Sequence, residues 1–266
     1  KLLRWKPYKK AAMNKKQLLQ QINRKKSYLC IGLDSDISKI PPHLLKYKNP
    51  ILEFNKQIID ATHDVCVAYK PNLAFYEIYG AKGWETLEKT ITHIPENIFK
   101  IADAKRGDIG NTSTMYAQAF LENMPFDAIT IAPYMGEDSI TPFLKIKNKW
   151  VIVLGLTSNQ GARDFEMLDL GGEKLYERVI KTVASWGTPQ NTMFVVGATH
   201  PHLISEIRAM VPDYFFLVPG VGAQGGDMQM TCENGINQDI GLLINSSRNI
   251  LYASSDENFA QAARQA

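Results

Sequence analysis

Short apolar runs alternate with amphipathic segments along most of this chain, and this alternation restricts the possible folds more than any other feature. The runs are rich in β-branched and aromatic residues, which is typical of parallel strands buried on both faces. Strands are predicted over residues 28–34, 65–71, 98–105, 128–133, 151–157, 193–198, 215–219 and 242–246. Between them, residues 51–63 and 173–186 carry apolar side chains at helical spacing.

Eight strands, each followed by a helical segment, predict an α/β protein that folds as a (β/α)8 TIM barrel with a single domain. A doubly wound open sheet has the same local pattern and is the alternative. The chain has 266 residues, a length that suits one barrel. We expect the barrel over residues 14–266 and a basic, solvated and disordered extension over residues 1–13.

Composition argues against several classes of function. The net charge is only +3, and no basic stripe interleaved with aromatic residues indicates nucleic-acid binding. No apolar stretch reaches the ~20 residues that span a membrane, and no signal peptide is recognisable. Cys30, Cys66 and Cys232 are widely spaced and odd in number, so we expect neither a disulfide framework nor a zinc site. A reducing compartment, and hence a cytoplasmic location, is expected.

A barrel carries its chemistry at the carboxyl ends of its strands, and polar residues lie at these positions here. Each of these residues falls at or just after a predicted strand, and only Asp103 and Lys105 belong to the same strand: Asp34, Lys70, Asp103, Lys105, Ser158, Gln224 and Arg248. The pattern therefore predicts a polar site at one end of the barrel.

The charged run at residues 100–109 gives the sharpest local signal. Side chains alternate along a strand, so Asp103 and Lys105 should point the same way, into the barrel. Two ionisable groups at such a position are costly unless they are paired. Asp108 follows the strand, near the first turn of the next helix. An ordinary salt bridge followed by an acid at a helix N-terminus is the alternative interpretation.

The spacing Asp103-x-Lys105-x-x-Asp108-Ile109 resembles the D-x-K-x-x-D-I signature of orotidine 5′-phosphate decarboxylase. Further segments resemble the family in the same order: Gly32-Leu33-Asp34, Tyr69-Lys70-Pro71-Asn72, Ser158 with Gly161-Ala162, the glycine-rich residues 219–226, and Arg248. The resemblance covers residues 28–255 and is closest to the longer bacterial form. One departure is Ser158-Asn159-Gln160-Gly161, where the family often has Ser-His-Pro-Gly.

This resemblance implies a carboxy-lyase that converts orotidine 5′-phosphate to uridine 5′-phosphate (UMP) in de novo pyrimidine biosynthesis, with no cofactor and no metal. Lys105 would protonate C6 of the pyrimidine. Asp103 would lie beside the substrate carboxylate, and Lys70 would hold Asp103 ionised and oriented. In the family, the residue matching Asp108 reaches the neighbouring subunit's site. A homodimer is therefore expected, with Asp108 and Thr112 contributed across the interface.

The resemblance also assigns residues to the rest of the substrate. Asp34 would bind the ribose hydroxyls, and Ser158 would contact the amide edge of the pyrimidine. Gln224 and Arg248 would bind the phosphate, which agrees with the frequent use of the loops after strands seven and eight for phosphate in barrels. No role is assigned to Asn72.

Several alternatives remain. Other barrel enzymes, such as 3-keto-gulonate-6-phosphate decarboxylase and hexulose-6-phosphate synthase, share D-x-K-x-x-D but use magnesium and an open-chain sugar phosphate; Lys70 favours the orotidine enzyme. A non-catalytic barrel that binds a phosphorylated ligand is the alternative from another class. The dinucleotide pattern Gly220-x-Gly222-x-x-Gly225 lies too late in the chain. His200-x-His202 is more typical of a helix start than of a metal site.

Overall fold

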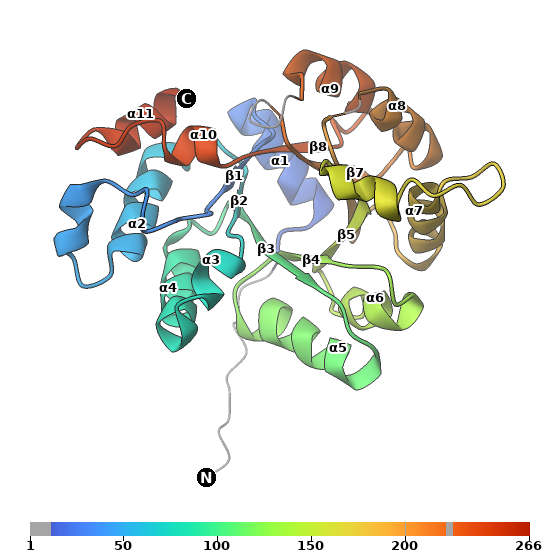
Figure 1. Ribbon diagram of the computed structural model, residues 1–266, viewed down its shortest axis with the longest axis horizontal. Helices are drawn as coiled ribbons and strands as arrows, with labels where there is room; N and C mark the ends of the chain where they lie inside the picture. Colours follow the sequence, from blue (N-terminus) through green and yellow to red (C-terminus); the bar gives the residue numbers. More distant parts are fainter. Residues whose placement is uncertain (1–11, 200, 222–225) are drawn as a thin grey trace, which may run out of the picture.

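A closed barrel of parallel strands forms the centre of the molecule (Figure 1). The computed structural model describes residues 12–266 apart from His200 and residues 222–225. In this part of the chain the strands are β1 (Leu29–Gly32), β2 (Ala68–Lys70), β3 (Phe99–Arg106), β4 (Ala128–Ile131), β5 (Trp150–Leu156), β6 (Thr192–Val196), β7 (Phe215–Pro219) and β8 (Leu242–Ser246). They pair in sequence order and β8 closes onto β1, which confirms the predicted barrel over the open sheet.

Helices follow the strands and surround the barrel (Figure 1). The α-helices are α1 (Lys15–Lys25), α2 (Pro50–Thr62), α3 (Ala74–Glu77), α4 (Gly80–His93), α5 (Gly110–Ala117), α6 (Glu137–Leu144), α7 (Leu175–Trp186), α8 (Pro201–Met210), α9 (Met228–Gly235), α10 (Arg248–Leu251) and α11 (Phe259–Gln265). Shorter turns are the 3-10 helices η1 (Pro42–Lys46) and η3 (Gln160–Asp164), and the π-helix η2 (Gln118–Asn123). The predicted helices 51–63 and 173–186 correspond to α2 and α7.

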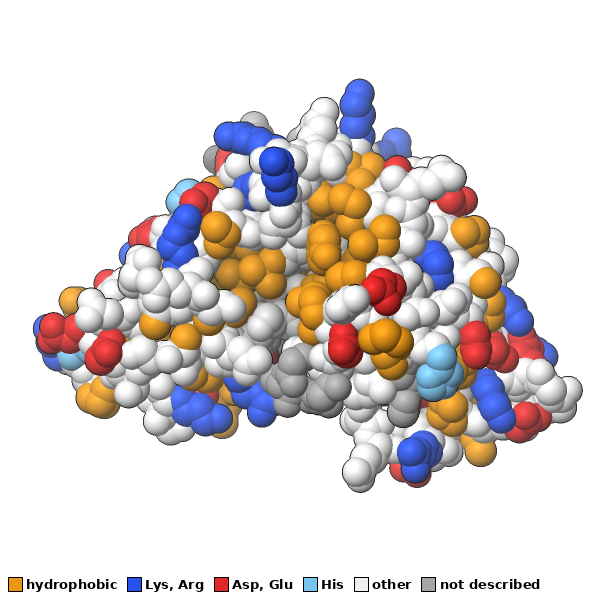
Figure 2. Space-filling view, turned by 90° about the horizontal axis from the view of Figure 1, so that it is seen from above, with side chains coloured by type: hydrophobic (Ala, Val, Ile, Leu, Met, Phe, Trp, Pro, Cys, Tyr) orange, Lys and Arg blue, Asp and Glu red, His pale blue; other side chains and the backbone are white. Residues whose placement is uncertain are grey.

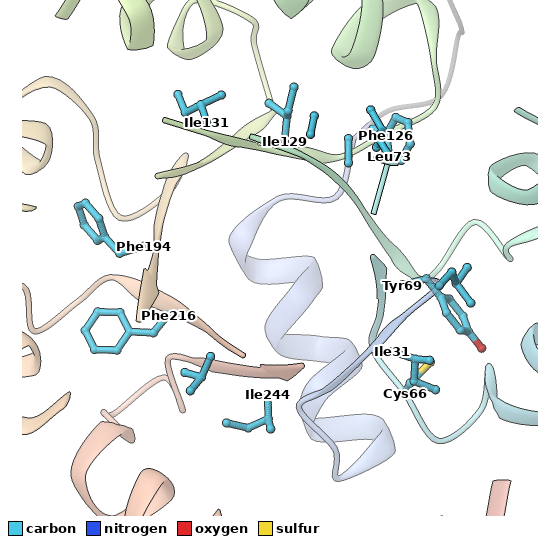
Figure 3. Close-up of a cluster of buried hydrophobic side chains, with 14 of the residues drawn as sticks. Ile31, Cys66, Tyr69, Leu73, Phe126, Ile129, Ile131, Phe194, Phe216 and Ile244 are labelled. Carbon is cyan, nitrogen blue, oxygen red and sulfur yellow. The ribbon is translucent and has the colours of Figure 1, made fainter. Parts of the chain in front are cut away.

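The strands are apolar on both faces because each face packs against a different part of the core. Side chains such as Ile129, Phe194 and Phe216 point away from the barrel axis and pack against the helices (Figure 3). Alternate residues, such as Phe99 and Phe215, fill the barrel interior. Successive side chains on a strand point to opposite faces, so burial of both faces produces the continuous apolar runs seen in the sequence.

Helix α1 closes one end of the barrel, and its position determines which end can hold a site. Asn14 caps the helix, because its side chain accepts a hydrogen bond from the Gln17 backbone N–H (3.0 Å). Leu18 and Ile22 pack on interior residues at the beginnings of strands, such as Phe99 in β3. The helix is visible behind the ring of strands (Figure 3). The end at which the strands begin is thus covered, and their carboxyl ends remain open.

The chain just before α1 is also part of the packed structure. Residues 1–11 of the predicted extension lie outside the described residues. Ala12 and Met13 are buried, in contrast to the solvated extension expected for them. The Met13 N–H donates to Asp127 (3.0 Å), and the Trp150 indole N–H donates to the Met13 carbonyl (2.8 Å). Packing against the barrel therefore begins at residue 12 at the latest.

One outer face of the barrel carries an apolar hollow. Figure 2 shows this face, over α9, α10 and α11, with hydrophobic side chains gathered in its middle and charged side chains around them. A cavity at this position is lined by residues that include Leu29, Val65, Met228 and Ile250. Within the described ranges, no helix combines the length and the apolar character needed to cross a membrane.

Candidate active site

Three charged side chains meet at the open end of the barrel and form what is called here the charge array: Lys70, Asp103 and Lys105. Lys70 is the last residue of β2, and the other two lie in β3. The two oxygens of Asp103 are shared between the lysines: Oδ2 accepts from Lys70 Nζ (2.7 Å) and Oδ1 from Lys105 Nζ (2.6 Å). Lys70 and Asp103 are only 5% and 8% exposed, whereas the Lys105 side chain is half exposed. Lys105 is thus the cation that faces the open space.

The charge array keeps its buried members ionised. Burial of the Asp103 carboxyl acts against ionisation, but the charges of Lys70 and Lys105 and their hydrogen bonds outweigh it and lower the pKa of Asp103 to about 2. Burial likewise disfavours the Lys70 ammonium, but the nearby carboxylates of Asp103 and Asp34 raise the pKa of Lys70 above its ordinary value. At neutral pH the array therefore holds a carboxylate between two ammonium groups.

The end of β3 departs from a regular strand. Alternation holds up to Ala104, because Ala102 and Ala104 both pack in the outer core while Asp103 faces inward. The pairing with β4 then shifts between Ala102 and Arg106, and Lys105 has a left-handed backbone with φ of 47°. The expected shared direction of Asp103 and Lys105 agrees with their contact at 2.6 Å, but regular strand alternation does not explain it. The Lys105 ammonium reaches Asp103 from a distorted backbone.

A single cavity connects the charge array with the ends of β7 and β8. It is lined by Asp34, Lys70, Asp103, Gly220, Asn245 and Arg248, among others. Asp34 Oδ1 and Asn245 Oδ1 are buried, and neither has a hydrogen-bond partner among the described residues. Buried polar atoms without partners are uncommon in proteins, so these two acceptors indicate where a ligand could supply donors.

Two glycines allow loops at the open end to approach the strands closely. A Cβ atom on Gly32 would lie 1.9 Å from Ser247 Oγ, in the loop just before Arg248. A Cβ atom on Gly197 would lie 2.8 Å from the Ser158 backbone nitrogen. Real Cβ atoms do not approach this closely, so both positions require glycine unless the loops move. Gly32 and Gly197 thus help to place the loops that carry Arg248 and Ser158.

Ser158 lies after β5 in a neighbouring cavity, together with Thr199 and His202. Thr157, the residue before Ser158, is held in place by Glu166 from the loop that follows. The Glu166 carboxylate accepts from the Thr157 N–H (2.7 Å) and hydroxyl (2.8 Å). This arrangement fixes the backbone from which Ser158 projects. The predicted phosphate residue Gln224 lies outside the described residues.

Asp108 and Thr112 lie apart from the charge array. The Asp108 carboxylate accepts the Ile109 N–H (2.7 Å), and within the described chain it forms no ion pair with Lys70 or Lys105. Thr112 is exposed in the first turn of α5. The structure of one chain thus unites Lys70, Asp103, Asp34 and Arg248, but leaves Asp108 and Thr112 outside that cavity.

Sequence reasoning did not identify Thr130 or Asn245. The Thr130 hydroxyl contacts Asp103 Oδ1 (3.0 Å), and Asn245 lines the cavity. Alternation could have found both, because each lies two residues after a residue of the barrel interior, Ala128 in β4 and Leu243 in β8. As for metals, the described part of the chain contains no group of three or more His, Cys, Asp or Glu placed to hold an ion.

The comparisons with known proteins agree with this geometry. The sequence model described as "Orotidine 5'-phosphate decarboxylase / HUMPS family" matches residues 27–265. A protein from Flavobacterium johnsoniae named orotidine 5′-phosphate decarboxylase is 58% identical over 256 residues, covering 95% of this chain and 94% of the relative. One of the same name from Phocaeicola vulgatus is 56% identical over 257 residues, again covering 95% and 94%.

Solved structures show the same fold. Leishmania donovani OMP decarboxylase has a TM-score of 0.82 and 37% identity, and the match covers 96% of this chain and all of that one (100%). Leishmania donovani UMP synthase has a TM-score of 0.83 and 39% identity, and the match covers 94% of this chain and 54% of that one. The match to the family model, the identity to these relatives and the shared barrel lead to one conclusion. The chain belongs to the orotidine 5′-phosphate decarboxylase / HUMPS family.

Proposed function

We propose that this protein decarboxylates orotidine 5′-phosphate to UMP, as a carboxy-lyase of pyrimidine biosynthesis that needs no cofactor. The observation that carries the proposal is the single cavity lined by Lys70, Asp103 and Arg248. The Asp103 carboxylate and the Lys70 ammonium at one end of it, with Lys105 bonded to the same carboxylate, suit the reacting carbon, and an arginine at the other end suits a phosphate. The names of the relatives from F. johnsoniae and P. vulgatus support this substrate.

Lys105 supplies the cation and the proton that the reaction needs. The bond between C6 and the carboxylate breaks, CO2 leaves, and the electron pair remains on C6, where no adjacent carbonyl delocalises it. An ammonium fixed beside C6 stabilises this charge and then transfers a proton to form the C6–H bond. Lys105 is half exposed and held by Asp103 at 2.6 Å, so its ammonium is oriented while its side chain remains accessible.

Asp103 contributes by repelling the substrate carboxylate. Two like charges ~4 Å apart repel by ~4 kcal/mol when the effective dielectric constant is near 20. Loss of CO2 moves the substrate's charge away from Asp103, so the repulsion raises the ground state more than the transition state. Burial of Asp103 acts against its ionisation. Lys70 is essential to the repulsion, because it helps to lower the pKa of Asp103 to about 2 despite this burial.

The rest of the substrate is bound by residues from several strands. Arg248 and Gln224 bind the phosphate, Asp34 binds ribose hydroxyls, and Ser158 binds the amide edge of the pyrimidine. The buried Asp34 Oδ1 lacks a donor in the described chain, which fits a ribose hydroxyl at this position. The phosphate lies far from C6, but the free energy of its binding can lower the barrier to decarboxylation, because it holds the substrate against the charge array.

The proposed enzyme is a homodimer with sites shared between subunits. Asp108 and Thr112 lie outside the chain's own charge array, so they are available to a partner's ligand. Large apolar side chains are exposed near them, including Ile109 at 55% and Met135 at 47%, whose Cε lies beside Gly107. Exposed apolar surface of this kind is typical of protein interfaces.

Two observations argue against the alternative functions. A magnesium ion on Asp103 would lie beside two ammonium groups, because Oδ2 accepts from Lys70 and Oδ1 accepts from Lys105, and like charges at this separation repel. A barrel that only binds a phosphorylated ligand would not need a buried ion pair, whose desolvation is costly.

Cys30, Cys66 and Cys232 are all free thiols, which supports a reducing compartment such as the cytoplasm.

The test is an assay with orotidine 5′-phosphate in excess chelator, in which the loss of ultraviolet absorbance is followed. We expect turnover at the same rate with and without chelator. Activity on a sugar phosphate that chelator abolishes would instead support the magnesium-dependent alternative. Binding of the nucleotide without turnover would support the non-catalytic one.

A further inference from the structure

The Thr130 hydroxyl lies between two members of the charge array. Thr130 is in β4 and is only 1% exposed. Its Oγ1 is 3.0 Å from Asp103 Oδ1 and 3.0 Å from the Lys105 backbone nitrogen. A backbone N–H can only donate, so the hydroxyl accepts from Lys105 and gives its single proton to the Asp103 carboxylate. One small group is thus bonded to both residues.

This contact occurs where β3 is distorted. The register between β3 and β4 shifts between Ala102 and Arg106, so the Lys105 N–H does not follow the regular ladder. Its φ of 47° is a left-handed conformation, which is unfavourable for a residue other than glycine. The Thr130 hydroxyl satisfies the displaced N–H, and this bond helps to hold Lys105 in its unusual conformation.

The same hydroxyl completes the set of donors around Asp103. Lys70 binds Oδ2, while Lys105 Nζ and Thr130 both bind Oδ1. A carboxylate that accepts at both oxygens from three donors on β2, β3 and β4 cannot rotate about its own bond without breaking several of them. Its plane is therefore set by the strands of the barrel.

We propose that Thr130 is a positioning residue for the decarboxylation: its hydroxyl fixes the carboxylate of Asp103 and the backbone of Lys105 relative to each other. This inference rests on the proposed function. Thr130 acts only through those two residues, so it should influence turnover and leave substrate binding unchanged. A misplacement of about 1 Å in such a pair can reduce turnover roughly 100-fold.

The test uses two substitutions that separate the hydroxyl from the shape of the side chain. Thr130→Val keeps the volume and removes the hydroxyl, while Thr130→Ser keeps the hydroxyl. Thr192→Val is the matched control, because Thr192 is also a fully buried strand threonine but lies at the start of β6, at the covered end of the barrel. Titration with UMP checks that each variant retains an intact binding site.

We expect Thr130→Val to lower kcat for orotidine 5′-phosphate by about 10- to 100-fold with KM within about twofold of wild type. Thr130→Ser should retain most of kcat, and Thr192→Val should match the wild type. Wild-type kcat in Thr130→Val, or an equal loss in the serine variant, would overturn the proposal. So would a rise in KM with unchanged kcat.

A measurement without substrate separates this inference from the proposed function. The Lys105 amide should exchange with solvent hydrogen at least about tenfold faster in Thr130→Val than in wild type, and Thr130→Ser should resemble the wild type. Unchanged exchange in the valine variant contradicts the positioning role. If exchange changes as expected but the wild-type protein does not turn over orotidine 5′-phosphate, the positioning contact stands and the proposed reaction is wrong.

Discussion

Asp103 lies at the centre of the charge array, and its neighbours show how far a sequence can predict such a residue. The D-x-K spacing and the position of Lys70 at a strand end indicated the three charged residues before the structure did. Alternation along β4 and β8 could have shown that Thr130 and Asn245 face inward, but it does not show which inward neighbour each side chain meets. That depends on the pairing register, which here shifts within β3.

The low pKa of Asp103 predicts how stability depends on pH. The group ionises with a pKa of about 2 in the folded protein, against an ordinary value of 3.8. A depressed folded-state pKa stabilises the protein above the unfolded pKa, and this contribution is lost as the pH falls from about 4 to about 2. The loss should be on the order of 2 kcal/mol.

Urea unfolding of wild type and Asp103→Asn at pH 5 and pH 2.5 measures this contribution. Asp103→Asn should be less stable at pH 5, because Lys70 is left buried without its carboxylate. Its free energy of unfolding should nevertheless fall less between the two pH values than that of the wild type. Equal falls in the two proteins would show that Asp103 is not held ionised by its neighbours.

At the scale of elements, the apolar runs predicted all of the strands of the barrel, and the bounds of β7 and β8 agree with the structure. Most of the other strands end earlier than predicted, as β1 does at Gly32, two residues before Asp34, whereas β3 ends one residue later, at Arg106. The reason is that apolar composition continues into the loops that are packed over the barrel mouth. The left-handed Lys105 could not be predicted, because the residue has no local preference for this conformation.

Arg248, the first residue of α10, is the proposed phosphate ligand, and this role predicts how its substitution affects substrates with and without phosphate. Arg248→Ala should lower kcat/KM for orotidine 5′-phosphate by roughly 10²-fold or more, because a charge-assisted bidentate contact is lost. It should hardly change the slow reaction of the unphosphorylated nucleoside, which never used this contact. Steady-state kinetics on both substrates measures the difference.

Arg178→Ala is the matched control for this substitution. Arg178 is a surface arginine of α7 paired with Glu173, away from the cavity. Its loss should leave both reactions unchanged. If Arg248→Ala reduced the reactions of nucleotide and nucleoside equally, Arg248 would act on the fold or on the charge array and not on the phosphate.

At the scale of the whole molecule, sequence periodicity predicted the barrel, and the closure of β8 onto β1 confirmed it. The role of α1 was not predicted, because a helix that precedes the first strand has no strand of its own to pack against. The burial of Met13 was missed for the same reason: its contacts with Asp127 and Trp150 span more than 100 residues of sequence.

The proposed shared sites predict that two inactive variants complement each other. Lys105→Ala removes the cation of a chain's own site, and Asp108→Ala removes the residue given to the partner. A mixed dimer then contains one intact site, so an equimolar mixture after subunit exchange should recover about a quarter of wild-type activity. Activity that stays at the level of the separate variants would show that Asp108 does not act across an interface.

The most direct test measures UMP formed from orotidine 5′-phosphate in excess chelator by wild type, Lys105→Ala and the control Lys181→Ala, which changes a half-exposed lysine of α7 paired with Glu173. Wild type and Lys181→Ala should form UMP at equal rates. Lys105→Ala should be slower by roughly 10²–10⁴-fold or more, because the proposed proton donor and its charge are both lost. No UMP from the wild type, or equal rates in wild type and Lys105→Ala, would contradict a decarboxylase that works through Lys105.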